Sequence, residues 1–170
     1  MRKFLMLVAV MVAAAALTAT TASGAVGNAH FIKNASSASL SGANLNCKFK
    51  EAGLASGSVE TVTCSATQTI VYECVNGGSK NPAASNKKTF STTVSKTGTF
   101  TADKNGNIVG TLSLAPVSAS SLGFSCPPGQ TVTLVSVSYS NVQVVDSTSG
   151  ASIALPGTFT YTNPKAPPVR

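Results

Sequence analysis

Apolar and polar side chains alternate along most of the chain, with a period of two rather than three or four residues. This period predicts β-strands, because successive side chains of a strand point to opposite faces of its sheet. The pattern is clear at Leu45, Cys47 and Phe49, and it resumes over residues 59–64 after a loop with two glycines. Two such runs joined by a glycine-containing loop predict a β-hairpin, which sets Cys47 opposite Cys64.

Further alternating runs follow, each bounded by residues that favour turns. They cover residues 69–75, 89–94, 98–103, 107–114, 131–146 and 151–163. The pair Asn105-Gly106 tolerates positive φ at both central positions of a type I′ turn, so it predicts that the runs on either side of it are adjacent antiparallel strands. Residues 79–88 are polar and contain a proline, which is typical of a surface loop.

These runs together predict an all-β protein. About eight short strands without any helical window favour an antiparallel two-sheet sandwich, immunoglobulin-like or related. A small closed β-barrel is the alternative arrangement. Threonine and serine fill many of the polar strand positions, and they suit the solvated face of a sheet.

The N-terminus has the features of a secretory signal peptide. A basic pair precedes an uncharged apolar run over residues 4–17, which is too short to span a bilayer comfortably. Small side chains follow, and we expect cleavage after Ala25, with Ala22 and Ala29 as alternative sites. The sequence therefore predicts a signal peptide over residues 1–25 and a secreted, extracellular protein that keeps no membrane span.

Removal of residues 1–25 from the 170 leaves 145, which is the size of one ordinary domain. We expect a single β-sandwich domain over residues 26–162 and a flexible, proline-rich tail over residues 163–170. The whole chain has 12 basic and 5 acidic residues, and loss of Arg2 and Lys3 leaves a mature net charge of 10 − 5 = +5. Lysines without interleaved aromatic residues argue against nucleic-acid binding.

Five lysines that lie close together in the sequence are candidates for a binding surface. They are Lys80, Lys87, Lys88, Lys96 and Lys104. On a single face they would favour anionic polymers or lipid headgroups. The alternative is a solvated face that only keeps the domain soluble.

Four cysteines lie in the exported part of the chain, where an even number normally forms disulfides. Four cysteines permit three pairings, and the register of the predicted hairpin favours Cys47–Cys64, which leaves Cys74–Cys126. Pro127 and Pro128 stiffen the backbone directly after this second bridge. This corner is interpreted as scaffold, and the alternative is a rigid loop that a secreted inhibitor presents to a protease.

The sequence gives little support to catalytic or metal chemistry. His30 is the only histidine, so a nucleophile activated by a histidine base is not indicated. No CxxC pair occurs either, which argues against a zinc site. The acidic residues are Glu51, Glu60, Glu73, Asp103 and Asp146, and no spacing among them singles out a catalytic pair. We therefore predict no catalytic residue, no cofactor and no metal.

Several segments of the mature chain, taken together, resemble a group of small actinobacterial secreted proteins. They are NAHFIKNASSASL, FKEAGL, YECVNGG, NPAASNK and CPPGQTVTLVSVSYSNVQVVD. The resemblance covers residues 30–146 and implies export and a β-rich domain. The shared pattern includes Cys74 and Cys126, whereas Cys47 and Cys64 look like an addition to it. It implies no substrate, cofactor or catalytic residue.

Three functions are consistent with these observations. The leading hypothesis is a secreted, non-enzymatic β-sandwich module that acts by surface contact with a cell-wall polymer or an extracellular protein. The second is an inhibitor of an extracellular protease that uses the loop after Cys126 or the loop over residues 76–88. The third is a secreted hydrolase that uses one or two of the five acidic residues.

Overall fold

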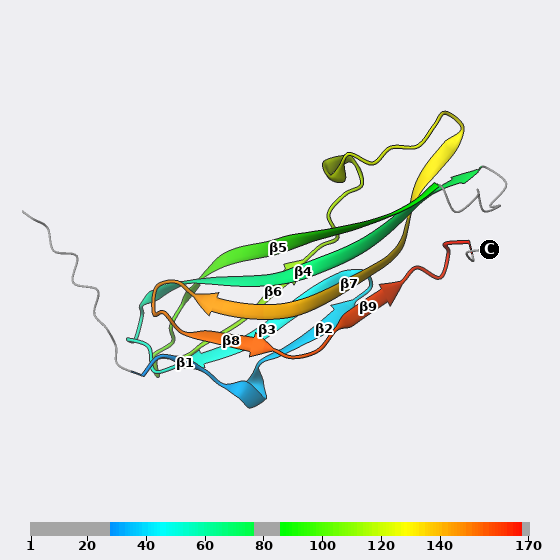
Figure 1. The fold of residues 1–170 in the computed structure, drawn as a ribbon. Helices are drawn as coiled ribbons and strands as arrows, with labels where there is room; N and C mark the ends of the chain where they lie inside the picture. The colour runs from blue at the N-terminus through cyan, green and yellow to red at the C-terminus, as the bar shows by residue number, and fades with distance from the viewer. Residues whose placement is uncertain (1–27, 77–85, 168–170) are drawn as a thin grey trace, which may run out of the picture.

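The computed structural model describes residues 28–76 and 86–167, and two antiparallel sheets make up most of this part of the chain (Figure 1). The signal peptide expected over residues 1–25 lies outside the described residues, as does Lys80. In the described ranges, none of the helices is long and apolar enough to cross a membrane.

The first sheet is built around β3 (Asn44–Ala52). One edge of β3 pairs with β6 (Ile108–Leu114). Its other edge pairs with two short strands in succession, β2 (Ser37–Ser41) and β1 (His30–Phe31). A single turn of 3-10 helix, η1 (Lys33–Ala35), joins these two strands, so residues 30–41 run along one edge of β3.

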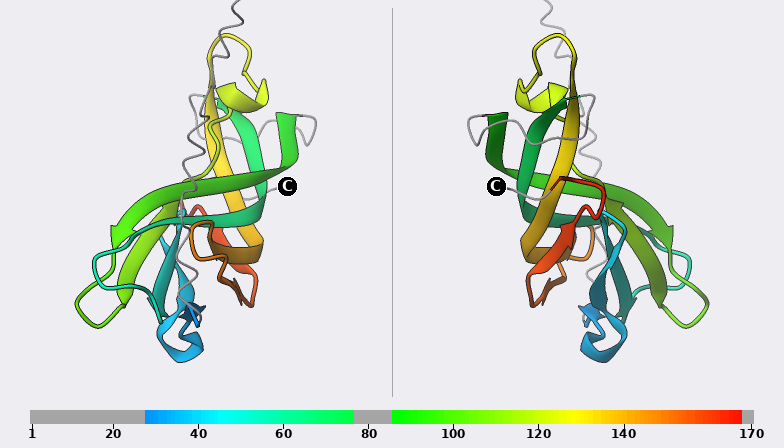
Figure 2. Two further views of the ribbon diagram at one scale, coloured as in Figure 1. Left: turned by 90° about the vertical axis from the view of Figure 1, so that its left-hand side faces the viewer. Right: turned by 90° about the vertical axis from the view of Figure 1, so that its right-hand side faces the viewer.

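The second sheet contains the three long strands of the molecule. β4 (Val59–Asn76) lies between β5 (Lys87–Thr101) and β7 (Gln130–Asp146). The far edge of β7 pairs with β8 (Ser152–Leu155) and β9 (Phe159–Thr162), each along a different half of β7. Viewed from the two sides, the sheets form two layers, and the ends of β4, β5 and β7 continue beyond the first sheet (Figure 2). The predicted two-sheet sandwich is confirmed, and the sheets do not close into the alternative barrel.

Two predicted hairpins are wrong, and both errors have the same cause. β3 and β4 belong to different sheets, and so do β5 and β6, although each pair is consecutive in the chain. Alternation identifies the buried face of a strand, but it does not determine whether the next strand pairs with it or packs opposite it. At the second connection only Gly106 has positive φ, so Asn105-Gly106 does not form the predicted type I′ turn.

The two connections between the sheets pack against each other. The Leu54 amide donates to the carbonyl of Gly106 at 3.0 Å. A Cβ at Gly106 would overlap the carbonyl oxygen of Leu54. Glycine is therefore required at this position both by its φ of 71° and by the close approach of the loop that precedes β4.

β4 is continuous, whereas the sequence predicts separate strands over residues 59–64 and 69–75. The polar side chain of Gln68 interrupts the apolar pattern, yet it is fully buried in the middle of the strand. Its amide nitrogen donates to the Ala115 carbonyl at 3.2 Å, and its oxygen accepts the Val117 amide at 2.9 Å. These two bonds offset the cost of burial and hold the segment after β6 against β4.

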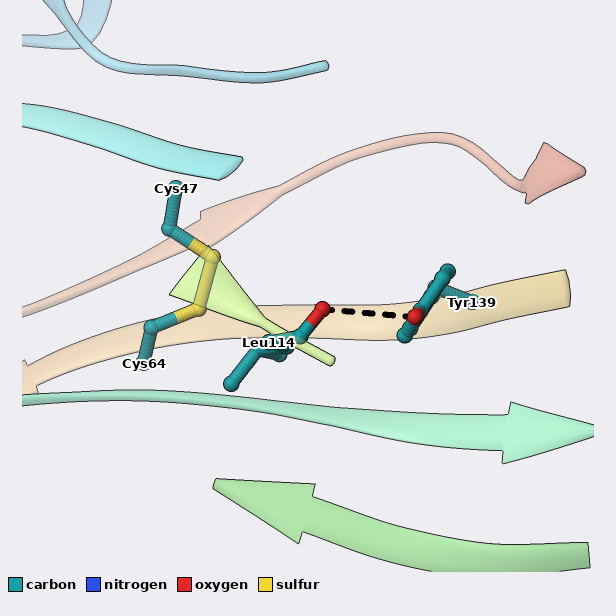
Figure 3. Close-up of a disulfide and its surroundings, with 4 residues drawn as sticks. All are labelled: Cys47, Cys64, Leu114 and Tyr139. Carbon is teal, nitrogen blue, oxygen red and sulfur yellow. Dashed lines mark hydrogen bonds between the residues drawn. A yellow bond between two sulfur atoms is a disulfide. The ribbon is translucent and has the colours of Figure 1, made fainter. Parts of the chain in front are cut away.

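The two disulfides join the predicted pairs of cysteines. The predicted hairpin that led to the first pair does not form, because Cys47 and Cys64 are on strands of different sheets. Cys47–Cys64 connects β3 with β4 across the sandwich, and both residues are fully buried. Next to it, Tyr139 is also fully buried, and its hydroxyl donates to the Leu114 carbonyl at 3.3 Å (Figure 3). The same hydroxyl lies 2.7 Å from the Ala43 carbonyl, to which it also donates. Burial raises the pKa of this hydroxyl to about 12, which keeps it a proton donor.

The first residues of the predicted flexible tail are held by the second sheet. The backbone amide of Asn163 donates to the Val135 carbonyl at 2.8 Å, and its side chain donates to the Leu134 carbonyl at 2.8 Å. The Ala166 amide closes a turn on Asn163 at 3.1 Å. These bonds extend the attachment of the chain to β7 beyond the end of β9.

Gly110 allows two aromatic rings from opposite sheets to meet. Phe49 of β3 and Phe100 of β5 pack edge to face with ring centroids 5.0 Å apart. A Cβ at Gly110 would lie 2.5 Å from carbon atoms of both rings. Any side chain on β6 at this point must therefore displace one of them.

We expect Gly110→Ala to lower the free energy of unfolding by about 1–3 kcal/mol, the usual cost of overpacking a core. Urea denaturation of the variant and the wild type measures the difference. Ser113→Ala is the matched control because Ser113 is exposed on the same strand, and its effect should stay within about 0.5 kcal/mol. Equal stabilities for Gly110→Ala and the wild type would contradict the packing described here.

Candidate functional site

The outer face of the second sheet is covered with hydroxyl groups. We call these side chains the hydroxyl face; they alternate with the core residues of their strands. On β4 they are Thr61, Thr63, Ser65, Thr67 and Thr69; on β5 they are Thr89, Ser91, Thr93, Ser95, Thr97 and Thr99; on β7, β8 and β9 they are Ser136, Ser138, Ser140, Ser152, Thr160 and Thr162.

The strand register arranges these hydroxyls in rows across the sheet. One row runs from Ser91 through Thr69 and Ser138 to Thr160, and each pair of neighbours in it is directly opposite in the register. Neighbouring strands lie about 4.8 Å apart, and residues two apart on a strand are separated by about 6.5–7 Å. The sheet therefore presents a regular two-dimensional array of groups that both donate and accept hydrogen bonds.

Some neighbouring hydroxyls are already hydrogen-bonded to each other. The Oγ1 atoms of Thr63 and Thr97 are 2.8 Å apart, and Ser138 Oγ lies 3.0 Å from Thr160 Oγ1. A hydroxyl has one proton and two acceptor sites, so each pair keeps capacity for further hydrogen bonds to a ligand.

The hydroxyl face contains neither charged nor aromatic side chains between the rows of Thr61 and Val71. The remaining outward residues there are Val71, Asn141, Gln143, Val145 and Ala154, and the side-chain amide of Asn141 donates to Thr67 Oγ1 at 3.4 Å. A ligand of this face would be bound through many neutral hydrogen bonds, because the described strands offer it no ion pair and no ring for stacking.

The four described candidate lysines are distributed along β5 and beyond its end. Lys87 is opposite Glu73 in the register and points to the same side as the hydroxyl face. Lys88 and Lys96 alternate with it toward the other side, and Lys88 Nζ lies 5.1 Å from the ring centroid of Phe90. Lys104 lies in the turn before β6. The structure therefore places these lysines on two sides of the strand and in a turn.

The proline corner is exposed and anchored at one end by the Cys74–Cys126 disulfide. Pro127 and Pro128 are exposed, and the Gln130 amide donates to the Pro127 carbonyl at 3.2 Å. Gly129 has a φ of 82°, which turns the chain into β7. The corner is thus a short, stiff segment at the end of the sandwich.

Aromatic rings support the segment that leads into this corner. A 3-10 turn, η3 (Ser120–Leu122), precedes Phe124, whose ring stacks on Tyr72 with centroids 6.2 Å apart and meets the edge of Phe90 at 6.0 Å. The Tyr72 hydroxyl donates to the Val117 carbonyl at 2.7 Å. β4 and β5 thereby hold the connection between β6 and β7.

Three of the five acidic residues converge inside the opposite end of the sandwich, a grouping that the sequence analysis missed. Glu51 ends the inward-facing series of β3, Glu60 begins that of β4, and Asp146 ends that of β7. Their side chains are 0, 4 and 0 % exposed. Glu73 and Asp103 are outside this group: Glu73 is on β4 near the disulfide corner, and Asp103 is exposed.

Each member of this carboxyl cluster has one oxygen bound and one oxygen without a partner. Ser149 donates to Glu51 Oε1 at 2.8 Å, Ser58 donates to Glu60 Oε1 at 2.5 Å, and the Thr148 amide donates to Asp146 Oδ1 at 2.8 Å. Glu51 Oε2, Glu60 Oε2 and Asp146 Oδ2 are buried without a hydrogen bond. Burial is the main cause that raises the pKa of Glu51 to about 7, and it also raises the pKa of Glu60.

Asp103 has a purely local role at its turn. Its carboxylate accepts the backbone amides of Asn105 at 2.8 Å and Asn107 at 3.0 Å. Hydrogen bonding from the Asn107 backbone is the main cause that lowers the pKa of Asp103. Within the described ranges, no group of three His, Cys, Asp or Glu side chains is arranged to hold a metal ion.

The chain matches no family model and no curated protein. The candidate sites therefore depend on the geometry of the described residues alone.

Removal of the corner disulfide tests how far it stabilises the fold. The Cys74 and Cys126 positions are separated by 52 residues, so the chain-entropy model gives a loss of about 4 kcal/mol for Cys74→Ala with Cys126→Ala. Denaturant unfolding of this double variant against the wild type measures the loss. A difference below about 1 kcal/mol would show that other contacts already restrict the unfolded chain.

Proposed function

We propose that this chain is a secreted, non-enzymatic β-sandwich module that binds a neutral, hydroxyl-rich polymer of the envelope or extracellular matrix through the hydroxyl face. Two disulfides are typical of proteins from oxidising compartments, which supports export. The resemblance to small actinobacterial secreted proteins supports the same location. The observation that carries the proposal is the uncharged array of hydroxyls over β4, β5, β7 and β9.

The chemistry of this array favours a long neutral polysaccharide. A single hydrogen bond contributes only about 0.5–1.5 kcal/mol after exchange with water, so useful affinity needs many contacts at once. A polysaccharide offers hydroxyls at regular intervals, and it gains affinity from simultaneous contacts along its length. A free sugar makes too few of these contacts and finds no aromatic ring to stack on.

Retention on neutral insoluble polysaccharide and on washed cell walls tests this proposal. We expect Thr69→Lys to reduce retention about tenfold or more, because Thr69 is exposed at the centre of the hydroxyl face and lysine covers its neighbours. Thr111→Lys is the matched control, since it adds the same charge at an exposed position on the outer face of the other sheet.

A second variant removes hydroxyls without adding charge. Thr63→Val, Thr67→Val and Thr69→Val together keep the β-branched shape, and we expect the same direction of change. Thermal unfolding checks that each variant is folded. If all folded variants are retained as well as the wild type, the hydroxyl face is excluded as the contact surface. Retention that disappears at high salt would instead indicate an anionic ligand of the lysines.

The proline corner supports inhibition of an extracellular protease as a second candidate function. Pro127 and Pro128 are exposed directly beside a disulfide, and a preorganised loop loses little entropy when it binds. We expect Pro127→Ala with Pro128→Ala to weaken a stoichiometric complex with the target protease about tenfold, measured by titration of proteolytic activity. Thr111→Lys should leave that complex unchanged, and equal inhibition by the proline variant would exclude the corner.

A further inference from the structure

The carboxyl cluster of Glu51, Glu60 and Asp146 connects the two sheets at one end of the sandwich. Glu51 comes from β3 of the first sheet, whereas Glu60 and Asp146 come from β4 and β7 of the second. Figure 1 shows these strand ends together, at the opposite end from the proline corner. Any interaction between Glu51 and the other two carboxyls is therefore also an interaction between the sheets.

Asp146 acts on both glutamates of the cluster. Its carboxyl raises the pKa of Glu51 and of Glu60, in addition to the larger effect of burial. In each of the three carboxyls, the oxygen that accepts no hydrogen bond is buried. Two carboxylate oxygens are both acceptors, so a contact between them becomes a hydrogen bond only when one group carries a proton.

No cation among the described residues neutralises the cluster. Apart from the cluster itself, the charged residues on the elements that border it are His30 on β1, Lys48 and Lys50 on β3, Glu73 toward the far end of β4, and Asp103 and Lys104 in the turn before β6. β6, β8 and the turn after β7 contribute none. None of these residues contributes to the pKa shifts of Glu51 and Glu60. Removal of the protons therefore leaves buried negative charges facing each other, which costs far more than in water.

We propose that Glu51, Glu60 and Asp146 form a proton-controlled clasp, which holds the two sheets together while its carboxyls share protons and loosens this end of the sandwich when they are lost. The proton is the ligand of this site, and its binding does not require the polymer contact proposed above.

The direction of the pH dependence follows from Glu51. Its pKa is raised from 4.5 to about 7 in the folded chain, mainly by burial, with repulsion from Asp146 and Glu60 in addition. Between these two values the unfolded chain has lost a proton that the folded chain retains. The stabilisation is therefore fully present below pH 4.5, decreases as pH rises, and is lost once the pH exceeds about 7.

Urea unfolding at a series of pH values from 5 to 9 tests the clasp. For the wild type we expect the equilibrium constant for unfolding to rise on the order of a hundredfold across this range, because each unit of pKa difference corresponds to about a factor of ten. Glu51→Gln keeps the shape and the bond from Ser149 but does not titrate, so we expect it to lose most of this rise and to exceed the wild type in stability at pH 9.

Asp103→Asn is the matched control, because it neutralises an exposed carboxylate that already titrates below this range. We expect its pH dependence to parallel that of the wild type. His30 is unchanged in all three proteins, so it cannot account for a difference between them. If Glu51→Gln does not fold, Glu60→Gln should still reduce the rise relative to Asp103→Asn.

Two outcomes would overturn the proposal. One is a pH dependence in Glu51→Gln and Glu60→Gln equal to that of the wild type. The other is a rise in wild-type stability at pH 9 on addition of calcium that Glu51→Gln lacks, since that result would make the ligand a metal cation instead of a proton.

Discussion

The Cys47–Cys64 disulfide is the constraint on which the arrangement of the molecule depends. It joins the middle of β3 to β4 in the facing sheet and is buried beside Tyr139. Because these consecutive strands lie in opposite layers, the loop between them must cross the sandwich, and the β5–β6 connection crosses beside it. Each sheet then has one face in the core and one face in solvent. The same alternation of side chains therefore places the hydroxyl face outside and the carboxyl cluster inside.

The sequence predicts the class of fold and the disulfides better than it predicts which strands are neighbours. Alternation at Cys47 and Cys64 correctly indicates that both sulfurs point into the core. A hairpin partner and a residue of the facing sheet both satisfy that requirement, so the correct pairing followed from a wrong register. The type I′ turn predicted at Asn105-Gly106 is wrong for a similar reason. Gly106 is needed for its φ and for its contact with Leu54, and a dipeptide does not reveal such features of tertiary packing.

The carboxyl cluster and the hydroxyl face can be predicted from the sequence to different extents. Glu51, Glu60 and Asp146 continue the inward phase of Phe49, Val62 and Val144, so their burial could have been inferred from the pattern, but their convergence depends on the sheet order. The hydroxyl face depends also on a bulge in β7. Asn141 has a φ of 52°, and the register shifts there, so that Ser140 and Gln143 both point outward. No periodicity predicts this change of phase.

The carboxyl cluster cannot be explained by stability alone. An apolar residue at Glu51 would continue the alternation of β3 and pack against the same core, and buried polar networks are often less stable than well-packed apolar replacements. What the carboxyls add is a dependence on protons in a chain with only five acidic residues. β4 and β7 carry Glu60 and Asp146 as well as much of the hydroxyl face. A change in how these strands are held at this end therefore reaches Thr61 and Thr63 first. By thermodynamic linkage, a polymer that favours the ordered face would in turn favour the protonated clasp.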